Sequence, residues 1–150
     1  MTTDALSISL KRTDATWLTF AGRLLLASIF IVSGLRKLGD LDGIVAYMAS
    51  NGIPLPSLLV WPAIVVELGS GLLLLAGLWT RWIAIVLLIW TLVLAMVFHP
   101  FWSADPKAYG LQLNLFLFHL ETAGGLLYIV AFGAGRLSLD HHRNELRAGR

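Results

Sequence analysis

The stretch from Trp61 to Trp82, WPAIVVELGSGLLLLAGLWTRW, constrains the fold of this chain more than any other. It is almost wholly apolar, with tryptophan at both ends and Arg81 just before the last of them. About 20 apolar residues in a helix, each rising ~1.5 Å, match the ~30 Å hydrocarbon core of a bilayer. A soluble helix would carry polar residues along one face, but none occur between Ser70 and Thr80. The stretch therefore predicts a transmembrane helix.

The composition extends this prediction to the whole chain. Hydrophobic residues make up 57% of the sequence and charged residues 13%, whereas about a quarter of the residues in soluble domains are charged. We predict an all-α fold, an integral membrane four-helix bundle that forms a single domain over residues 1–150. The expected spans lie at about 15–37, 60–79, 82–100 and 111–133, with polar tails at 1–13 and 135–150.

The segment between the first two spans has a different pattern. Ile44, Val45 and Met48 recur at helical spacing, and the proline pair Pro54 and Pro56 closes the segment. It is too short to cross a bilayer, so it predicts a short amphipathic helix at the membrane interface between spans 1 and 2.

Charge and cysteine content exclude several classes of function. The net charge is only +2 and the basic residues lie at the ends of apolar runs, which predicts a lipid bilayer as partner and no nucleic acid. The chain has no cysteine, which excludes dithiol chemistry, thiolate metal sites and cysteine-ligated iron–sulfur clusters. No intrinsic cofactor is expected, and any redox role would need a borrowed cofactor or a partner subunit.

The basic residues also predict the orientation. With four spans, both termini lie on one side, and most of the basic residues fall on that side: Lys11, Arg12, Arg23, Arg81, Arg136, Arg143, Arg147 and Arg150, against Arg36, Lys37 and Lys107 opposite. The positive-inside rule then predicts a multi-pass inner-membrane protein with both termini cytoplasmic. Lys11 and Arg12 precede a first apolar run long enough to span, so we expect an anchor and no cleavable signal peptide. Arg23 is expected to snorkel to the headgroups.

Glu67 is the anomaly, because a carboxylate at membrane depth costs several kcal/mol unless it is neutralised, paired or wetted. Counted from Trp61 it lies roughly 9 Å below the outer end of its helix, and other polar residues fall in the same outer half. The expected counter-charge is Arg36 or Lys37. The expected cavity is lined by Glu67, His99, Trp102, Gln112, Asn114, His119 and Glu121.

The fourth span carries two polar pairs on different faces. Asn114 and Glu121 are seven residues apart and share one face, as Gln112 and His119 share another. A glycine pair just after Glu121 favours that face as the one that packs into the bundle.

Two interpretations of these residues stay open. A carboxylate, imidazoles and amides in one outer cavity suit a quinone headgroup, with Glu67, His119 and Glu121 as candidate catalytic groups that relay protons. Equally, Glu67 can form a structural ion pair, while His119 and Glu121 hold helices together through hydrogen bonds. No metal site is predicted, because the Glu-x-x-His spacing is missing.

At these residues the chain resembles the DoxX family of small four-span membrane proteins. The matching stretches are Arg23 to Leu38, Tyr47 to Pro56, Val66 to Arg81, FHPFW at the end of the third span, Gln112 with the following NLFLFHLETAGGLL, and Gly135 to Asp140. The family often carries Lys-Asn where this chain has Phe118-His119. Relatives include a subunit of a thiosulfate:quinone oxidoreductase, so the resemblance implies association with a membrane oxidoreductase.

Three hypotheses about function follow. The first is an inner-membrane accessory or quinone-interacting subunit of an oxidoreductase system, with oxidoreductase subunits as partners. It would not be a self-sufficient enzyme, because no catalytic motif or thiol is present. The second is a non-enzymatic scaffold whose buried charges are structural. The third, a small-solute or proton carrier, is disfavoured because the third span and the inner half offer no continuous polar path. A homo-oligomer is compatible with all three.

Overall fold

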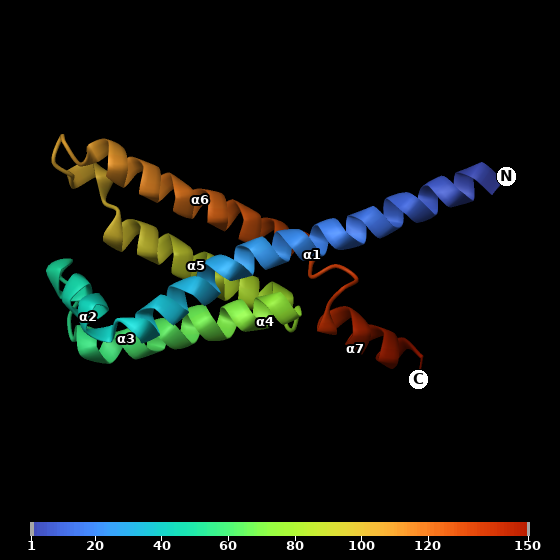
Figure 1. Ribbon diagram of the computed structural model, residues 1–150, viewed down its shortest axis with the longest axis horizontal. Helices are drawn as coiled ribbons and strands as arrows, with labels where there is room; N and C mark the ends of the chain where they lie inside the picture. The colour runs from blue at the N-terminus through green and yellow to red at the C-terminus, as the bar shows by residue number, and fades with distance from the viewer. Residues whose placement is uncertain (1, 150) are drawn as a thin grey trace.

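The computed structural model describes the backbone of residues 2–149 and the side chains of residues 16–149. The described part is all-helical (Figure 1). In chain order the elements are α1 (Thr2–Gly39), α2 (Leu41–Ser50), α3 (Pro56–Ile64), the π-helical turn η1 (Val65–Gly69), α4 (Ser70–Ala76), α5 (Thr80–Phe98), the 3-10 turn η2 (Phe101–Ser103), α6 (Tyr109–Phe132) and α7 (Leu139–Ala148). Figure 1 shows α3 and α4 as parts of one rod that runs alongside α1 and α5.

Four helical stretches are long and apolar enough to cross a membrane, as the sequence predicts. They are Thr16–Gly39, Pro56–Ala76, Thr80–Ser103 and Tyr109–Phe132. The second stretch begins at Pro56, four residues before the expected start near 60, because proline has a fixed φ that suits the first helical turn. It ends at Ala76, because Gly77 adopts a left-handed φ of 70° that closes the helix.

The short amphipathic helix between spans 1 and 2 is confirmed as α2. The Asp40 carboxylate accepts a hydrogen bond from the Gly43 N–H at 3.0 Å and caps its first turn. Buried Met48 packs with Val60 and Ile64 of α3, so this helix covers the beginning of the second span.

Glycines bring α1 against the second span. A Cβ on Gly34 would lie 2.8 Å from Leu68 Cβ, and one on Gly71 would lie 3.0 Å from Ile31 Cγ1. Neither position has room for a side chain, so the backbones approach closely, as small residues allow in membrane bundles.

The prediction that Arg23 extends to the lipid headgroups is wrong. Its side chain is buried, 3% exposed, and does not reach the headgroups. The guanidinium donates hydrogen bonds to the backbone carbonyls of Leu75, Ala134 and Leu137. Carbonyls left open at the end of one helix and in the chain after another satisfy the buried cation. Arg23 therefore joins α1, α4 and the segment between α6 and α7.

The expected polar tail at 135–150 contains helix α7, which is attached to the bundle at its first turn. The Asp140 carboxylate accepts hydrogen bonds from the N–H groups of Trp79 and Thr80, at 2.9 and 2.8 Å, and from the Thr80 hydroxyl at 2.8 Å. The Asp140 N–H donates to the Gly77 carbonyl at 2.9 Å. Burial alone would raise the pKa of Asp140, but these hydrogen bonds and the nearby Arg143 outweigh it and lower the pKa below its usual value. At the other end of the chain, the first span begins at Thr16, close to the expected 15, but helix α1 begins earlier, at Thr2. Whether residues 1–13 are exposed lies outside the described side chains.

We expect Asp140→Ala to destabilise the protein by about 1–2 kcal/mol, the typical effect of losing a helix-capping side chain. Because folding lowers the pKa of Asp140, its contribution is present above the pKa of the unfolded chain, near 3.9, and is lost as the pH falls through the folded value. Thermal unfolding in detergent should show a Tm difference that is constant from neutral pH to about pH 5 and narrows below about pH 4. A difference independent of pH down to pH 3 would contradict the carboxylate as the cause. Asp140→Asn keeps one acceptor oxygen and should therefore lose less stability than Asp140→Ala.

Candidate functional site

Glu67 lies in the middle of the second span, at the only π-helical turn among the described residues. The turn Val65–Gly69 follows Pro62, which has no N–H to donate within the helix. Such widened turns occur mostly as single insertions in α-helices, often at functional sites. Because the helix starts at Pro56, Glu67 lies roughly 16 Å from the start of the helix at 1.5 Å per residue, deeper than the expected 9 Å.

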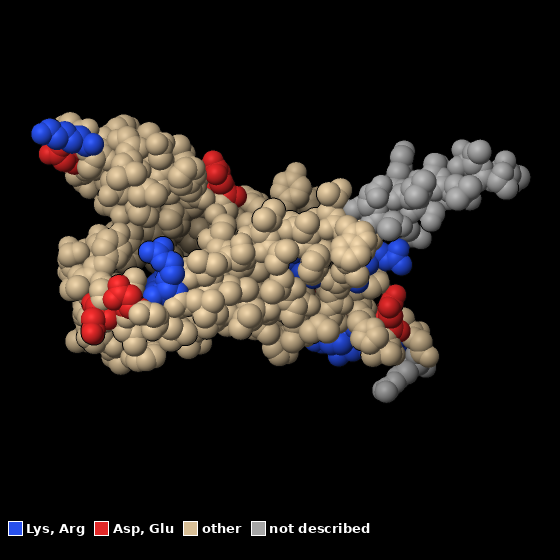
Figure 2. All heavy atoms as spheres, in the orientation of Figure 1, with Lys and Arg blue, Asp and Glu red and all other residues tan. Residues whose placement is uncertain are grey.

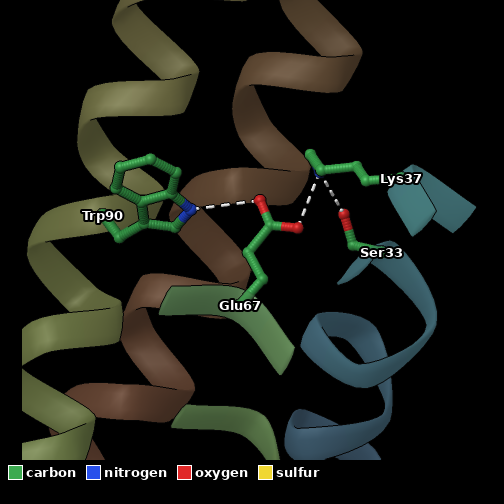
Figure 3. A network of polar contacts seen from close by, with 4 residues as sticks. All are labelled: Ser33, Lys37, Glu67 and Trp90. Atoms are coloured by element: carbon green, nitrogen blue, oxygen red, sulfur yellow. Dashed lines mark hydrogen bonds and ion pairs between the residues drawn. The ribbon is translucent and has the colours of Figure 1, made fainter. Parts of the chain in front are cut away.

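Two side chains on neighbouring helices, Lys37 and Trp90, bond to this carboxylate, and Ser33 holds the lysine (Figure 3). Lys37 Nζ lies 2.6 Å from Glu67 Oε2 and donates a second hydrogen bond to Ser33 Oγ at 2.8 Å. Trp90 Nε1 donates to the other oxygen, Oε1, at 3.1 Å. Glu67 is 1% exposed and Lys37 17%. Both carboxylate oxygens are thus bonded. Of the two cations expected as the counter-charge, Lys37 is the one that pairs with Glu67, and Arg36 is exposed.

A cavity of about 220 Å³ lies beside this ion pair. Its lining combines polar and apolar side chains from four helical elements: Ile29, Phe30, Ser33, Glu67, Thr91, Leu94, Phe118, His119 and Thr122. The cavity is smaller than the ~300–1,000 Å³ typical of sites for drug-sized ligands, so it suits one small ring and not a whole lipid.

Thr91 is the one described side chain with a buried polar atom that lacks a hydrogen-bond partner among the described residues. The residue is 3% exposed, and its hydroxyl oxygen bonds to nothing described. A buried hydroxyl left unsatisfied costs about 1–3 kcal/mol. Thr122 also lines the cavity, but its hydroxyl donates to the Phe118 carbonyl at 3.0 Å. Thr91 therefore offers the cavity a hydrogen-bond donor that no described residue uses.

Two of the lining residues also face the surroundings of the bundle. Ile29 on α1 is 50% exposed and Phe118 on α6 is 58% exposed, although both line the cavity. Both belong to transmembrane stretches, so the surroundings at these positions are lipid. The cavity therefore has apolar lining residues that are also in contact with lipid.

The two histidines of the expected site, His99 and His119, lie next to each other. The rings of His99 and His119 have their centroids 5.0 Å apart. His99 Nδ1 is hydrogen-bonded with Gln112 Oε1 at 3.0 Å, and His119 Nδ1 with the Leu115 carbonyl at 2.8 Å. A carbonyl only accepts, so Nδ1 of His119 carries its proton and Nε2 is left as the acceptor. His119 lines the cavity, whereas His99 and Gln112 do not.

Three other residues that were expected to line the cavity do not line it. Asn114 and Glu121 are exposed on the opposite side of α6, so the Gln112–His119 face is the one that packs inward, and the glycine pair indicated the wrong face. Trp102 is 55% exposed and makes edge-on ring contacts with Phe101 and Phe116 instead of lining the cavity.

Sequence reasoning missed the roles of Ser33, Trp90 and Thr91. Trp90 gave one usable signal, because it lies in the middle of a span and not at an interface. A buried indole N–H needs an acceptor, and Glu67 is the carboxylate that supplies one. Ser33 precedes Lys37 by one helical turn, a spacing that permits their hydrogen bond without predicting it.

These features define a four-span integral membrane protein with a buried ion pair beside a small cavity. The chain belongs to the DoxX family, whose model matches residues 18–100. It is similar to the inner membrane protein YphA of Escherichia coli K12, with 34% identity over 123 residues that cover 82% of this chain and 88% of YphA. It is also similar to the inner membrane protein YqjF of the same organism, with 31% identity over 123 residues, 82% of this chain and 89% of YqjF. No solved structure matches the chain. The protein is therefore a DoxX-family inner-membrane protein.

The ion pair should show strong coupling in a double-mutant cycle. Glu67→Gln and Lys37→Met each leave the other charge buried and unpaired, which typically costs about 3–5 kcal/mol. The double variant removes both charges, so we expect it to be more stable than either single variant. Unfolding in mixed detergent micelles, followed by Trp fluorescence, would measure this. Arg36→Met serves as a matched control and should change stability by less than about 0.5 kcal/mol. Additive losses in the double variant would show that the two side chains do not depend on each other.

Proposed function

We propose that this protein is an accessory, quinone-interacting subunit of a membrane oxidoreductase system. The observation that supports this is the lipid-facing cavity with an unused buried donor, Thr91, beside the ion pair of Glu67 and Lys37. A quinone ring carries two carbonyl acceptors and an apolar tail. The cavity offers a donor for a carbonyl, space for one ring and, for the tail, apolar lining residues in contact with lipid.

The proposed chemistry divides between this chain and a partner. Reduction of a quinone to a quinol takes up two electrons and two protons. The chain has no cysteine, and its residues suggest no electron carrier of their own, so the electrons would come from a cofactor of a partner subunit. The protons would pass through His119, whose Nε2 is not held by the hydrogen bond that occupies Nδ1. His99 lies between His119 and the outer end of the bundle, where it can exchange protons with water.

A scaffold function is the second candidate, and one observation favours it. Both oxygens of Glu67 are already bonded within the bundle, by Lys37 and Trp90, as in a pair that fixes helix packing. That arrangement needs no ligand. It leaves the Thr91 hydroxyl unexplained, because an architectural core gains nothing from an unsatisfied donor. For this reason we place the quinone-interacting role first.

The decisive test is binding of a short-tailed ubiquinone or menaquinone analogue to purified protein in nanodiscs, measured by quenching of Trp90 and the other tryptophans. Thr91→Val is nearly isosteric and removes the donor, so we expect affinity to fall roughly tenfold, the effect of about 1.4 kcal/mol, with no loss of stability. Thr122→Val is the matched control: it removes a hydroxyl whose proton is already used, and affinity should stay within about twofold. If the wild-type protein binds no analogue, the proposed function is wrong and the scaffold role takes its place.

We also propose that both termini are cytoplasmic and that α2 and the α5–α6 loop face outward, since the basic residues gather at the terminal end. Figure 1 shows the two termini at the same end of the bundle. Because the chain has no cysteine, a single introduced thiol reports its own side. In intact cells, a membrane-impermeant maleimide should label Ala104→Cys in the outer loop and leave Ala148→Cys in α7 unlabelled until the membrane is opened. The reverse labelling pattern would show that the termini lie outside and would contradict the proposed orientation.

A further inference from the structure

The exposed carboxyl of Glu121 is the feature of this bundle that its own helices do not explain. Glu121 lies halfway along the transmembrane helix α6, between Tyr109 and Phe132, and its side chain points away from the other helices. It has no hydrogen bond or ion pair with any residue whose side chain is described. In Figure 2 most charged groups lie toward the two ends of the molecule, and a red group stands on the tan surface along α6. A carboxyl group facing lipid at the bilayer centre is strongly unfavourable, so this surface needs a cover.

Other residues on the same side of α6 form a continuous seam with Glu121. The seam consists of positions spaced alternately by three and four residues, all exposed: Asn114, Leu117, Glu121, Gly124 and Tyr128. This is the a/d spacing with which one helix packs along another. A Cβ added at Gly124 meets nothing within 4 Å, so this glycine is not required by any contact inside the bundle. Small residues at such positions let a second helix approach closely.

We propose that this seam is the interface of a homodimer, in which α6 packs against α6 of a second copy of this chain. Two copies inserted in the same direction can be related by a two-fold axis along the membrane normal. Every residue of the seam then meets its own counterpart at the same depth. The interface must therefore consist of groups that are complementary to themselves.

Both polar groups of the seam meet this requirement. The Asn114 amide has donors and an acceptor, so two copies hydrogen-bond to each other, as a buried asparagine does at a single a position of a parallel coiled coil. Two Glu121 carboxyl groups that share a proton likewise provide a donor and an acceptor. Gly124, one turn further in, leaves room for the helices to cross. No cation from this chain is needed at that depth.

The proposal does not depend on the quinone-interacting role, because the seam and the cavity lie on different sides of α6. His119 and Thr122 line the cavity, whereas Asn114 and Glu121 do not. Loss of quinone binding and loss of dimerisation can thus be observed separately.

Disulfide crosslinking in native membranes tests the interface directly, because the chain contains no cysteine of its own. We expect Leu117→Cys, in the seam, to form a disulfide-linked dimer on mild oxidation. Leu127→Cys is the matched control: it is 54% exposed on the same helix, but is turned about 100° away from the seam, and it should stay monomeric. Equal crosslinking at both positions, or none at Leu117, would overturn the proposal.

Glu121 variants then distinguish a second copy from another occupant. Single-molecule photobleaching in dilute liposomes should show dimers for wild type. Glu121→Gln keeps a self-complementary group and should dimerise nearly as well, whereas Glu121→Leu should weaken dimerisation roughly tenfold. Glu121→Lys should abolish dimers, because two cations would meet. A wild-type protein that is monomeric in liposomes would reject the homodimer and point to a foreign helix that carries a basic residue. Thermal unfolding of each variant separates these outcomes from simple misfolding.

Discussion

The buried ion pair between Lys37 and Glu67 is the interaction on which the packing around it depends. A carboxylate about 16 Å below the helix end is tolerated only if a cation and hydrogen-bond donors reach it. Lys37 can do so because Gly34 and Gly71 let α1 lie directly against the second span. The π-helical turn at Val65–Gly69 places Glu67 between α1 and α5, where Trp90 reaches its second oxygen. One charge thus accounts for the close packing, the widened turn and an indole in the middle of a span.

The two ends of the bundle are built differently. At the terminal end, Arg23 and Asp140 act mainly on backbone groups and tie together the ends of α4, α5 and α6 with the start of α7. Backbone carbonyls and N–H groups at helix ends are fixed in position, so these hydrogen bonds hold the helices of this end in place. In the half of the bundle that holds Glu67 the polar groups are side chains around a cavity, and one of them, Thr91, has its hydroxyl unbonded among the described residues. This contrast is why we propose binding at the cavity and a structural role for the bonds at the terminal end.

The sequence predicted the elements well, because length and hydropathy determine which segments cross a bilayer. All four spans and the short helix α2 are where the apolar runs place them. Arg36 and Lys37 were the cations expected near Glu67, and the structure pairs Lys37 with it. Which face of a helix packs into the bundle was harder to predict. Apolar residues occur all round α6, so no periodicity distinguishes its faces, and the glycine pair after Glu121 pointed to the wrong one. Arg23 was misplaced because snorkelling depends on where neighbouring helix ends lie, which no local pattern shows.

Three acidic side chains differ in whether the bundle supplies them with hydrogen-bond or ion-pair partners. Asp140 is satisfied by the N-terminus of α5, and Glu67 by a lysine and an indole, both within the chain. Glu121 alone of the three is exposed at membrane depth with no described partner. Membrane-facing polar groups usually find partners, and the unmatched Glu121 is therefore the reason we propose a second copy at this face. Because Asn114 lies two turns from Glu121 on the same exposed side, a single neighbouring helix can satisfy both groups. The polar groups that looked like parts of one site in the sequence therefore lie on two surfaces of the bundle, one that lines the cavity and one that is exposed along α6, where we propose the second copy.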